Sequence, residues 1–184
     1  MKRLATYFIM FMLLTVIFVA CSKTENFERT SILENEIEIT STSLNSEGKW
    51  KTVITSSDGE NKTPQLSWSP VESASCYAIY MFDITAGNWC HWIAKDVKVT
   101  ELELGAKLED SQYIGPYPPS GVHTYEVRTF ALKDSPDSYS GRFDNVNPSL
   151  DDIIKALDTS KGKTGNVLAT GVLRGTYKTG DIVE

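Results

Sequence analysis

The stretch SCYAIYMFDITAGNWCHWIA, residues 75–94, decides the fold. Its two halves, 75–83 and 89–94, are apolar on both alternating faces, and neither half presents a polar face to water. Strands that are covered on both sides have this composition. The residues between them, 84–88, include a glycine and an asparagine, which are typical of turns. The stretch therefore predicts two buried strands separated by a turn.

Further strands are expected on both sides of this pair. Short runs rich in Val, Ile, Thr, Tyr, Phe and Trp recur along the chain, separated by Gly, Pro, Asn, Asp and Ser. Several strands at this spacing favour an antiparallel sandwich or barrel. The expected strands lie at Ile37–Ile39, Lys49–Thr55, Leu66–Trp68, His123–Leu132 and Asn166–Gly175.

One segment, residues 149–158, is predicted to be helical. Ser149 is placed to cap it, and the apolar residues that follow have the spacing i, i+3, i+4 and i+7. Those apolar residues are Leu150, Ile153, Ile154 and Leu157.

Composition narrows the classes of function. The chain has 184 residues, with 18 Lys+Arg against 24 Asp+Glu and a formal net charge of -6. This length suits one domain with an appendage, and the acidic balance argues against nucleic-acid binding. The 3 cysteines form no CxxC pair, and there are only 2 histidines. Any site built on imidazole must therefore use His91 or His123.

The N-terminus has the pattern of a secreted lipoprotein. Lys2 and Arg3 precede an uncharged apolar run at residues 7–20, which is short for a membrane span and suits a signal peptide. The run ends in Ala20-Cys21, which resembles the bacterial lipobox. We therefore expect a signal peptide at 1–20, a lipid-modified Cys21 (palmitate or a similar acyl chain), a flexible tether over 21–30 and a domain over 31–184. This predicts a lipid-anchored protein of the bacterial cell envelope, on the outer membrane or the periplasmic side where two membranes exist.

The two remaining cysteines, Cys76 and Cys90, are predicted to be buried and reduced. If their strands pair antiparallel, the cysteines stand about 20 Å apart along the sheet at ~3.3 Å per residue. A disulfide requires Cα atoms within about 7 Å.

Three ionisable residues mark a candidate site. Asp83 ends one apolar strand, His91 lies in WCHW, and His123 opens another strand. Residues 113–121 between the histidines contain three prolines and two glycines, so the loop is stiff and its backbone amides can approach a ligand. Imidazolium and N–H groups would donate to a small anion, and Asp83 would orient a histidine. The same three side chains are also an acceptable partial ligand set for zinc, although no fourth ligand is evident.

These residues carry a family resemblance. From about Ile37 to Thr179 the chain resembles the phosphatidylethanolamine-binding protein family, closest to its bacterial Raf-kinase-inhibitor-like branch. The family's motifs have similar counterparts, in the same order, in Pro64-Gln65-Leu66-Ser67-Trp68, Asp83, Trp89-Cys90-His91-Trp92, Gly115-Pro116-Tyr117-Pro118-Pro119, His123-Thr124-Tyr125, and Val167-Leu168-Ala169-Thr170 with Gly175-Thr176-Tyr177.

The resemblance implies a mainly β fold, an antiparallel β-sandwich with Greek-key connections and one or two short helices. It also implies a small pocket at the rim for phosphate or another anionic head group. By position, the residues of that pocket would be Asp83, His91, Gly115, Pro116, His123 and Tyr125.

Two departures from the family pattern stand at the pocket. Where the family has a second Asp, this chain has Thr85, and Thr124 replaces the arginine of the family's His-Arg-Tyr motif. We hypothesise that the missing Asp and Arg are partners across the rim, because losing both leaves no charge unpaired. The hypothesis requires Thr85 and Thr124 to be close together.

The sequence thus predicts a binding module without a cofactor, whose partners are a small anionic ligand or phospholipid head group and the membrane. A regulatory protein that inhibits an enzyme partner through its surface is the alternative. A weak hydrolase is the third reading, although no Gly-x-Ser-x-Gly elbow is present.

Overall fold

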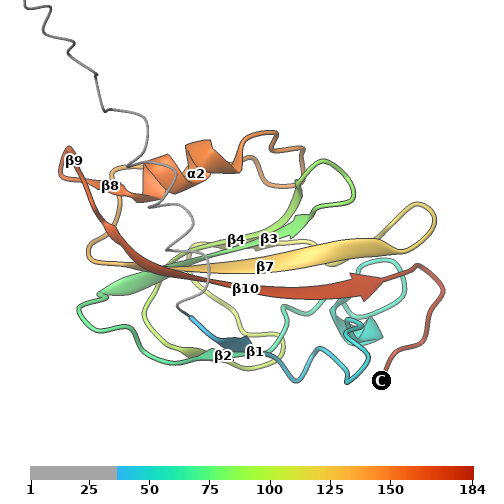
Figure 1. Ribbon diagram of the computed structural model, residues 1–184. Helices are drawn as coiled ribbons and strands as arrows, with labels where there is room; N and C mark the ends of the chain where they lie inside the picture. The colour runs from blue at the N-terminus through green and yellow to red at the C-terminus, as the bar shows by residue number, and fades with distance from the viewer. Residues whose placement is uncertain (1–36) are drawn as a thin grey trace, which may run out of the picture.

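The computed structural model describes residues 37–184. Within them, ten strands, one α-helix and one 3₁₀ helix form a mainly β domain (Figure 1). Their bounds are β1 Ile39–Thr40, η1 Thr52–Ile54, β2 Leu66–Trp68, β3 Cys76–Asp83, β4 Trp89–Val97, β5 Glu101–Leu102, β6 Ser111–Tyr113, β7 His123–Leu132, α2 Leu150–Leu157, β8 Thr159–Ser160, β9 Lys163–Thr164 and β10 Val167–Tyr177.

A five-stranded sheet in the order β10-β7-β3-β4-β6 carries most of the fold, and all its neighbours are antiparallel. Its central strand β3 is buried at all eight positions. The turn between β3 and β4 places Gly87 and Asn88 at positive φ, which a turn of this tightness requires. This confirms the two buried strands expected from residues 75–94.

The five-stranded sheet is the middle of three layers (Figure 1). The small sheet β1-β2-β5 covers one face, and between them lies a core that includes Trp68, Met81 and Trp92. Helix α2 covers the other face, where it packs on Tyr80 and Phe130. From Cys76 to Phe82 the side chains of β3 alternate between these two apolar cores, which explains why this part of the strand has no polar face.

Helix α2 begins and ends close to the predicted limits. Ser149 accepts a hydrogen bond from the backbone N–H of Asp152 at 3.2 Å, which confirms the expected cap. Ile153 and Leu157 are buried under the helix. The short hairpin β8-β9 follows, and the sequence had not indicated it.

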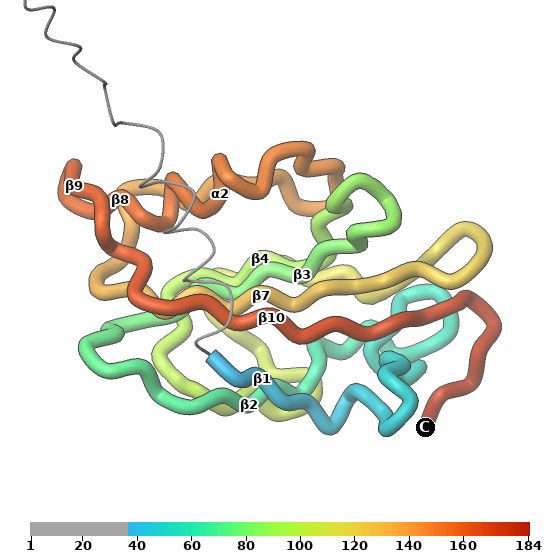
Figure 2. Tube along the Cα trace, in the orientation of Figure 1, coloured from blue at the N-terminus to red at the C-terminus, as the bar shows by residue number. Residues whose placement is uncertain are grey.

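The strand predicted at Lys49–Thr55 is wrong. The chain makes only single bridges at Lys49 and Trp50 and then turns into η1. The reason lies far away in the sequence. The Thr52 N–H donates to the Val183 carbonyl at 2.9 Å, and Oγ1 of Thr52 accepts from the Val183 N–H at 2.8 Å. Figure 2 shows the last residues running beside this segment.

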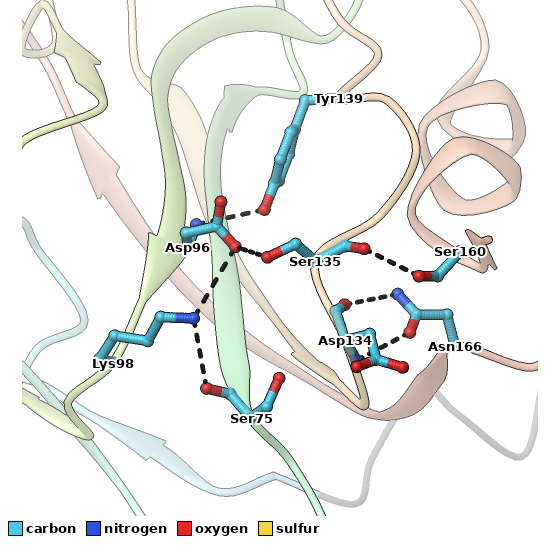
Figure 3. Close-up of polar contacts among 8 residues, drawn as sticks. All are labelled: Ser75, Asp96, Lys98, Asp134, Ser135, Tyr139, Ser160 and Asn166. Atoms are coloured by element: carbon cyan, nitrogen blue, oxygen red, sulfur yellow. Dashed lines mark hydrogen bonds and ion pairs between the residues drawn. The ribbon is translucent and has the colours of Figure 1, made fainter.

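A polar cluster fixes the end of β4 that is remote from Asp83 (Figure 3). Ser135 donates to Oδ1 of Asp96 at 2.5 Å, and the Tyr139 hydroxyl accepts from the Asp96 amide at 3.2 Å. Lys98 lies 4.0 Å from the same carboxylate. These contacts hold the chain that leads from β7 towards α2 against β4.

Cys76 and Cys90 are both buried and free. The strands that carry them pair antiparallel, with Phe82 opposite Cys90 and Tyr77 opposite Val97, so the two thiols lie near opposite ends of the pair. Burial raises the pKa of Cys90 to about 12, which keeps its thiol protonated. Within residues 37–184, no helix has the length and apolar character needed to span a bilayer.

Candidate functional site

Asp83 and His123 meet at one end of the five-stranded sheet. Asp83 ends β3, His123 begins β7, and Nδ1 of the imidazole lies 2.6 Å from Oδ2 of the carboxylate. The other carboxylate oxygen accepts the backbone N–H groups of Thr85 and Ala86 at 2.9 and 3.0 Å. Asp83 is only 3% exposed, so this pairing satisfies a buried charge. An ionised carboxylate only accepts, hence Nδ1 of His123 carries the proton and Nε2 points elsewhere.

His91 reaches the same region because β4 contains a bulge. Met81 pairs with Trp92 and Phe82 pairs with Cys90, which leaves His91 as the extra residue. A bulge re-aims a side chain, and the His91 ring packs against Tyr125 of β7. No motif in the sequence marks this irregularity.

The protonation of His91 follows from its surroundings. It is 2% exposed, and its Nδ1 lies 2.9 Å from the carbonyl oxygen of Ile114, which can only accept. Burial lowers the pKa of His91, and the Ile114 carbonyl and the charge of Asp83 oppose this effect only in part. Near neutral pH His91 is therefore uncharged, with the proton on Nδ1 and a lone pair on Nε2. The expectation that both histidines donate to an anion changes accordingly, since a neutral His91 offers an acceptor.

Tyr125 connects the two histidines. Its ring centroid lies 5.2 Å from that of His91, edge to face, and 6.5 Å from that of His123, nearly parallel. The side chain is fully buried, and no described residue has hydrogen-bonding geometry to its hydroxyl. Burial and the nearby Asp83 carboxylate raise the pKa of Tyr125, so the hydroxyl keeps its proton. The hydroxyl thus interacts with Asp83 without a well-aligned hydrogen bond, and a buried donor in this state suits a place that a ligand or water fills.

The loop of Gly115 and Pro116 supports the site and does not supply a free amide there. The Gly115 N–H donates to Oδ1 of Asn61 at 2.6 Å, and the Gly115 and Pro116 carbonyls both accept from Ser56. A Cβ on Gly115 would lie 2.0 Å from the Ile54 carbonyl oxygen. The glycine is therefore needed for close backbone packing, and the expected approach of its amide to a ligand is wrong.

Thr85 and Thr124, which replace the family's Asp and Arg, are neighbours. The backbone N–H of Thr124 donates to Oγ1 of Thr85 at 2.9 Å, and the Thr124 carbonyl accepts from Ile84 at 3.0 Å. The two positions therefore meet the closeness that the paired-loss hypothesis requires.

Three further residues belong to the site and were missed in the sequence. The Tyr117 ring packs edge to face on His91 at 5.2 Å, and its hydroxyl donates to Oδ1 of Asp144 at 2.7 Å. Nε1 of Trp89 donates to the same oxygen at 3.1 Å. Tyr117 occupies the variable position of the Gly-Pro-x-Pro-Pro motif, and nothing in the sequence links it to Asp144.

Access to this site is narrow. Of its central side chains, Asp83 and His91 are almost fully buried, and 13% of the His123 side chain is exposed. Two hollows on the described surface lie elsewhere, one of about 430 Å³ beside Thr52 and Val183 and one of about 550 Å³ beside Tyr77 and Val99. Within residues 37–184, no three His, Cys, Asp or Glu side chains are grouped as metal ligands.

The fold and the site define a β-sheet domain of the binding type. The sequence profile of the family described as phosphatidylethanolamine-binding protein matches residues 38–178. A UPF0098 protein of Methanothermobacter thermautotrophicus is 30% identical over 143 residues, covering 67% of this chain and 87% of that protein. The chain therefore belongs to the phosphatidylethanolamine-binding protein family.

Solved structures agree on the fold. A structure titled as a phosphatidylethanolamine-binding protein homologue from Chlamydia trachomatis matches with a TM-score of 0.61 and 23% identity, over 78% of this chain and 98% of that one. E. coli YbcL, titled as a new member of the mammalian family, matches with a TM-score of 0.58 and 20% identity, with the same coverage. The predicted mainly β, antiparallel fold is confirmed.

Proposed function

We propose that this protein is an exported, lipid-anchored binding module of the bacterial Raf-kinase-inhibitor-like branch, whose site at Asp83, His91 and His123 takes a small anionic group such as a phosphate or a phospholipid head group. The hydrogen bond between Asp83 and His123 carries the proposal. This bond holds Nδ1 of His123, and no described residue bonds to Nε2 of the same ring. A protonated His123 can then donate from Nε2 to an anion while Asp83 stabilises the imidazolium.

His91 and Tyr125 indicate which kind of anion the site would take. Neutral His91 offers a lone pair on Nε2, and Tyr125 offers a hydroxyl proton. An oxyanion that retains one proton complements this combination, because it both accepts from His123 or Tyr125 and donates to His91. A phosphate or phosphomonoester monoanion has this chemistry.

Titration with inorganic phosphate tests the anion site. We expect saturable shifts of the His91 and His123 ring signals in NMR spectra, and about a tenfold or greater loss of affinity in His123→Ala, because a charge-assisted hydrogen bond disappears. Tyr139→Phe, which removes a tyrosine hydroxyl at the other end of β4, is the matched control and should bind as the wild type does. Absence of saturable shifts in the wild type would contradict the proposal.

The alternative functions predict different outcomes of the same variants. Inhibition of an enzyme partner that survives in His91→Asn and His123→Ala would favour regulation through the surface. Turnover of a phosphoester that His123→Ala abolishes would favour a hydrolase.

The lipid anchor rests on the N-terminal sequence, which lies outside the described residues. A basic start, an apolar run at residues 7–20 and Ala20-Cys21 support it. Mass spectrometry of the protein isolated from membranes should find an acylated Cys21 as the first residue. Cys21→Ser should move the protein out of the membrane fraction, and an unmodified, uncleaved N-terminus in the wild type would contradict the anchor.

A further inference from the structure

His91 packs against two tyrosines that differ in their exposure. Tyr125 is fully buried in the core, whereas Tyr117 is half-buried and its hydroxyl reaches the exposed carboxylate of Asp144. Both rings lie 5.2 Å from His91 between centroids. Of these two rings, Tyr117 is therefore the one that separates the imidazole from solvent.

The acceptor that holds Tyr117 is built into the sheet. Asp144 donates its backbone N–H to the Cys90 carbonyl at 2.9 Å, and the next residue, Asn145, accepts from the Cys90 N–H at 2.9 Å. Trp89 adds its indole N–H to the Asp144 carboxylate. These bonds fix the carboxylate beside β4, so its contact with Tyr117 is not that of a freely moving loop.

The backbone on both sides of Tyr117 is also fixed. Pro116 and Pro118 are buried, and their carbonyls accept hydrogen bonds from Ser56 at 3.2 Å and Thr179 at 2.7 Å. Each proline also fixes its own φ, and Pro118 restricts the backbone of Tyr117, the residue that precedes it. The part of this region that is free to move is therefore the Tyr117 side chain, whose χ angles can change without moving the loop.

We propose that Tyr117, held by Asp144, covers His91 and restricts the site to small anionic groups. While the Tyr117 hydroxyl is bonded to Asp144, a ligand enters beside His123, and a bulky substituent on its phosphate contacts the Tyr117 ring. Rotation of the ring away from Asp144 opens the way to His91. Burial and the bond to Asp144 raise the pKa of Tyr117 to about 12, which keeps the hydroxyl a donor at neutral pH. This selectivity rests on the anion site proposed above, whereas the cover itself does not.

The cover is tested without any ligand by the reaction of histidine with diethyl pyrocarbonate, which modifies neutral imidazole. Peptide mass spectrometry follows His91 and His123 separately. We expect Tyr117→Ala to raise the modification rate of His91 about tenfold or more and Tyr117→Phe to raise it less, because the ring remains but the latch is lost. The rate at His123 should stay within about twofold, as the local solvent exposure there is unchanged. Tyr139→Phe is the matched control.

Selectivity is tested by comparing inorganic phosphate with phenyl phosphate. In Tyr117→Ala we expect the affinity for phenyl phosphate to rise about tenfold or more, the scale of discrimination by size, with phosphate changed less than about threefold. An unchanged His91 rate in folded Tyr117→Ala overturns the cover. Accelerated His91 modification with no change in the ratio of the two affinities overturns the selectivity alone. If neither anion binds any variant, the anion site fails, and the His91 rates still decide on the cover.

Discussion

Oδ2 of Asp83 lies 2.6 Å from Nδ1 of His123, although 40 positions separate the two residues in the chain. The contact joins the end of the central strand β3 to the beginning of the neighbouring strand β7, and it lies at the centre of the candidate site. It satisfies a buried carboxylate, and it holds a proton on Nδ1 of His123 while Nε2 has no bond to a described residue.

Asp83→Asn tests that contact. An amide has one acceptor oxygen where the carboxylate has two, so either His123 or the turn amides lose their partner. We expect about 1–3 kcal/mol less stability in urea unfolding, and phosphate affinity lower by about tenfold. Asp110→Asn is the control, since its carboxylate pairs with Lys95 at 3.2 Å on the surface and should contribute less than about 1 kcal/mol. Equal losses in both variants would contradict the role of Asp83.

The lowered pKa of His91 makes stability depend on pH. In the unfolded chain histidine titrates near its ordinary pKa of about 6.5, so below this pH the unfolded state takes up a proton that the buried ring resists. The stability that neutral His91 contributes is therefore complete above that pH and decreases as the pH falls towards the folded pKa. Urea unfolding between pH 7 and pH 5 should show a steeper decrease for the wild type than for His91→Asn, whose amide can still donate to Ile114. Parallel curves would show that His91 is not the cause.

Glu126 lies on the face of β7 opposite His123 and Tyr125, and its buried carboxylate predicts that replacing its two arginine partners will lower stability by unequal amounts. Glu126 is 2% exposed and accepts from Nε of Arg174 on β10 at 2.7 Å and from Nε of Arg128. The Arg174 side chain is 62% exposed, whereas that of Arg128 is 12% exposed. We expect Arg174→Ala to lower the free energy of unfolding by less than about 1 kcal/mol and Arg128→Ala by about 3 kcal/mol. The reverse order in urea unfolding would show that Arg174 is the main counter-ion.

Gly115→Ala should disturb the loop that holds Tyr117. A methyl group there would lie 2.0 Å from the Ile54 carbonyl, so the backbone must shift, which costs about 1–3 kcal/mol or more. Gly121 in the same loop has open space around it but a φ of +73°, a conformation that asparagine tolerates. Thermal unfolding of Gly121→Asn should therefore remain within about 1 kcal/mol of the wild type. A fully stable Gly115→Ala would contradict the close packing.

Local sequence patterns were sufficient where each element makes its own core contacts. β3 is apolar on both faces because two cores flank it, and α2 has its cap and apolar stripe within ten residues. The strand predicted at Lys49–Thr55 was wrong because this segment depends on contacts with a distant part of the chain. Its Val and Ile suit a strand, but its hydrogen-bond partners near Val183 lie 131 positions away, where no local pattern indicates them.

The site was predictable only in part, because some of its residues are positioned by contacts that no local pattern indicates. Asp83 ends β3 and His123 begins β7. These two strands pair directly, so strand order alone brings the two residues together. His91 depends on a bulge, which changes the direction of a side chain without any signal in residue type. Tyr117 depends on Asp144, which belongs to the segment between β7 and α2 and reaches the rim through backbone bonds to Cys90.

The wide spacing of the site residues along the chain has a consequence for folding kinetics. Asp83, His123 and Asp144 contact partners that lie 27 to 55 positions away in the chain. We expect such non-local contacts to form late in folding, because they require the closure of long loops. A ligand held by these residues stabilises interactions that are absent from an early transition state. Phosphate should then slow unfolding and leave the folding rate nearly unchanged, a partition that stopped-flow refolding and unfolding in urea can measure.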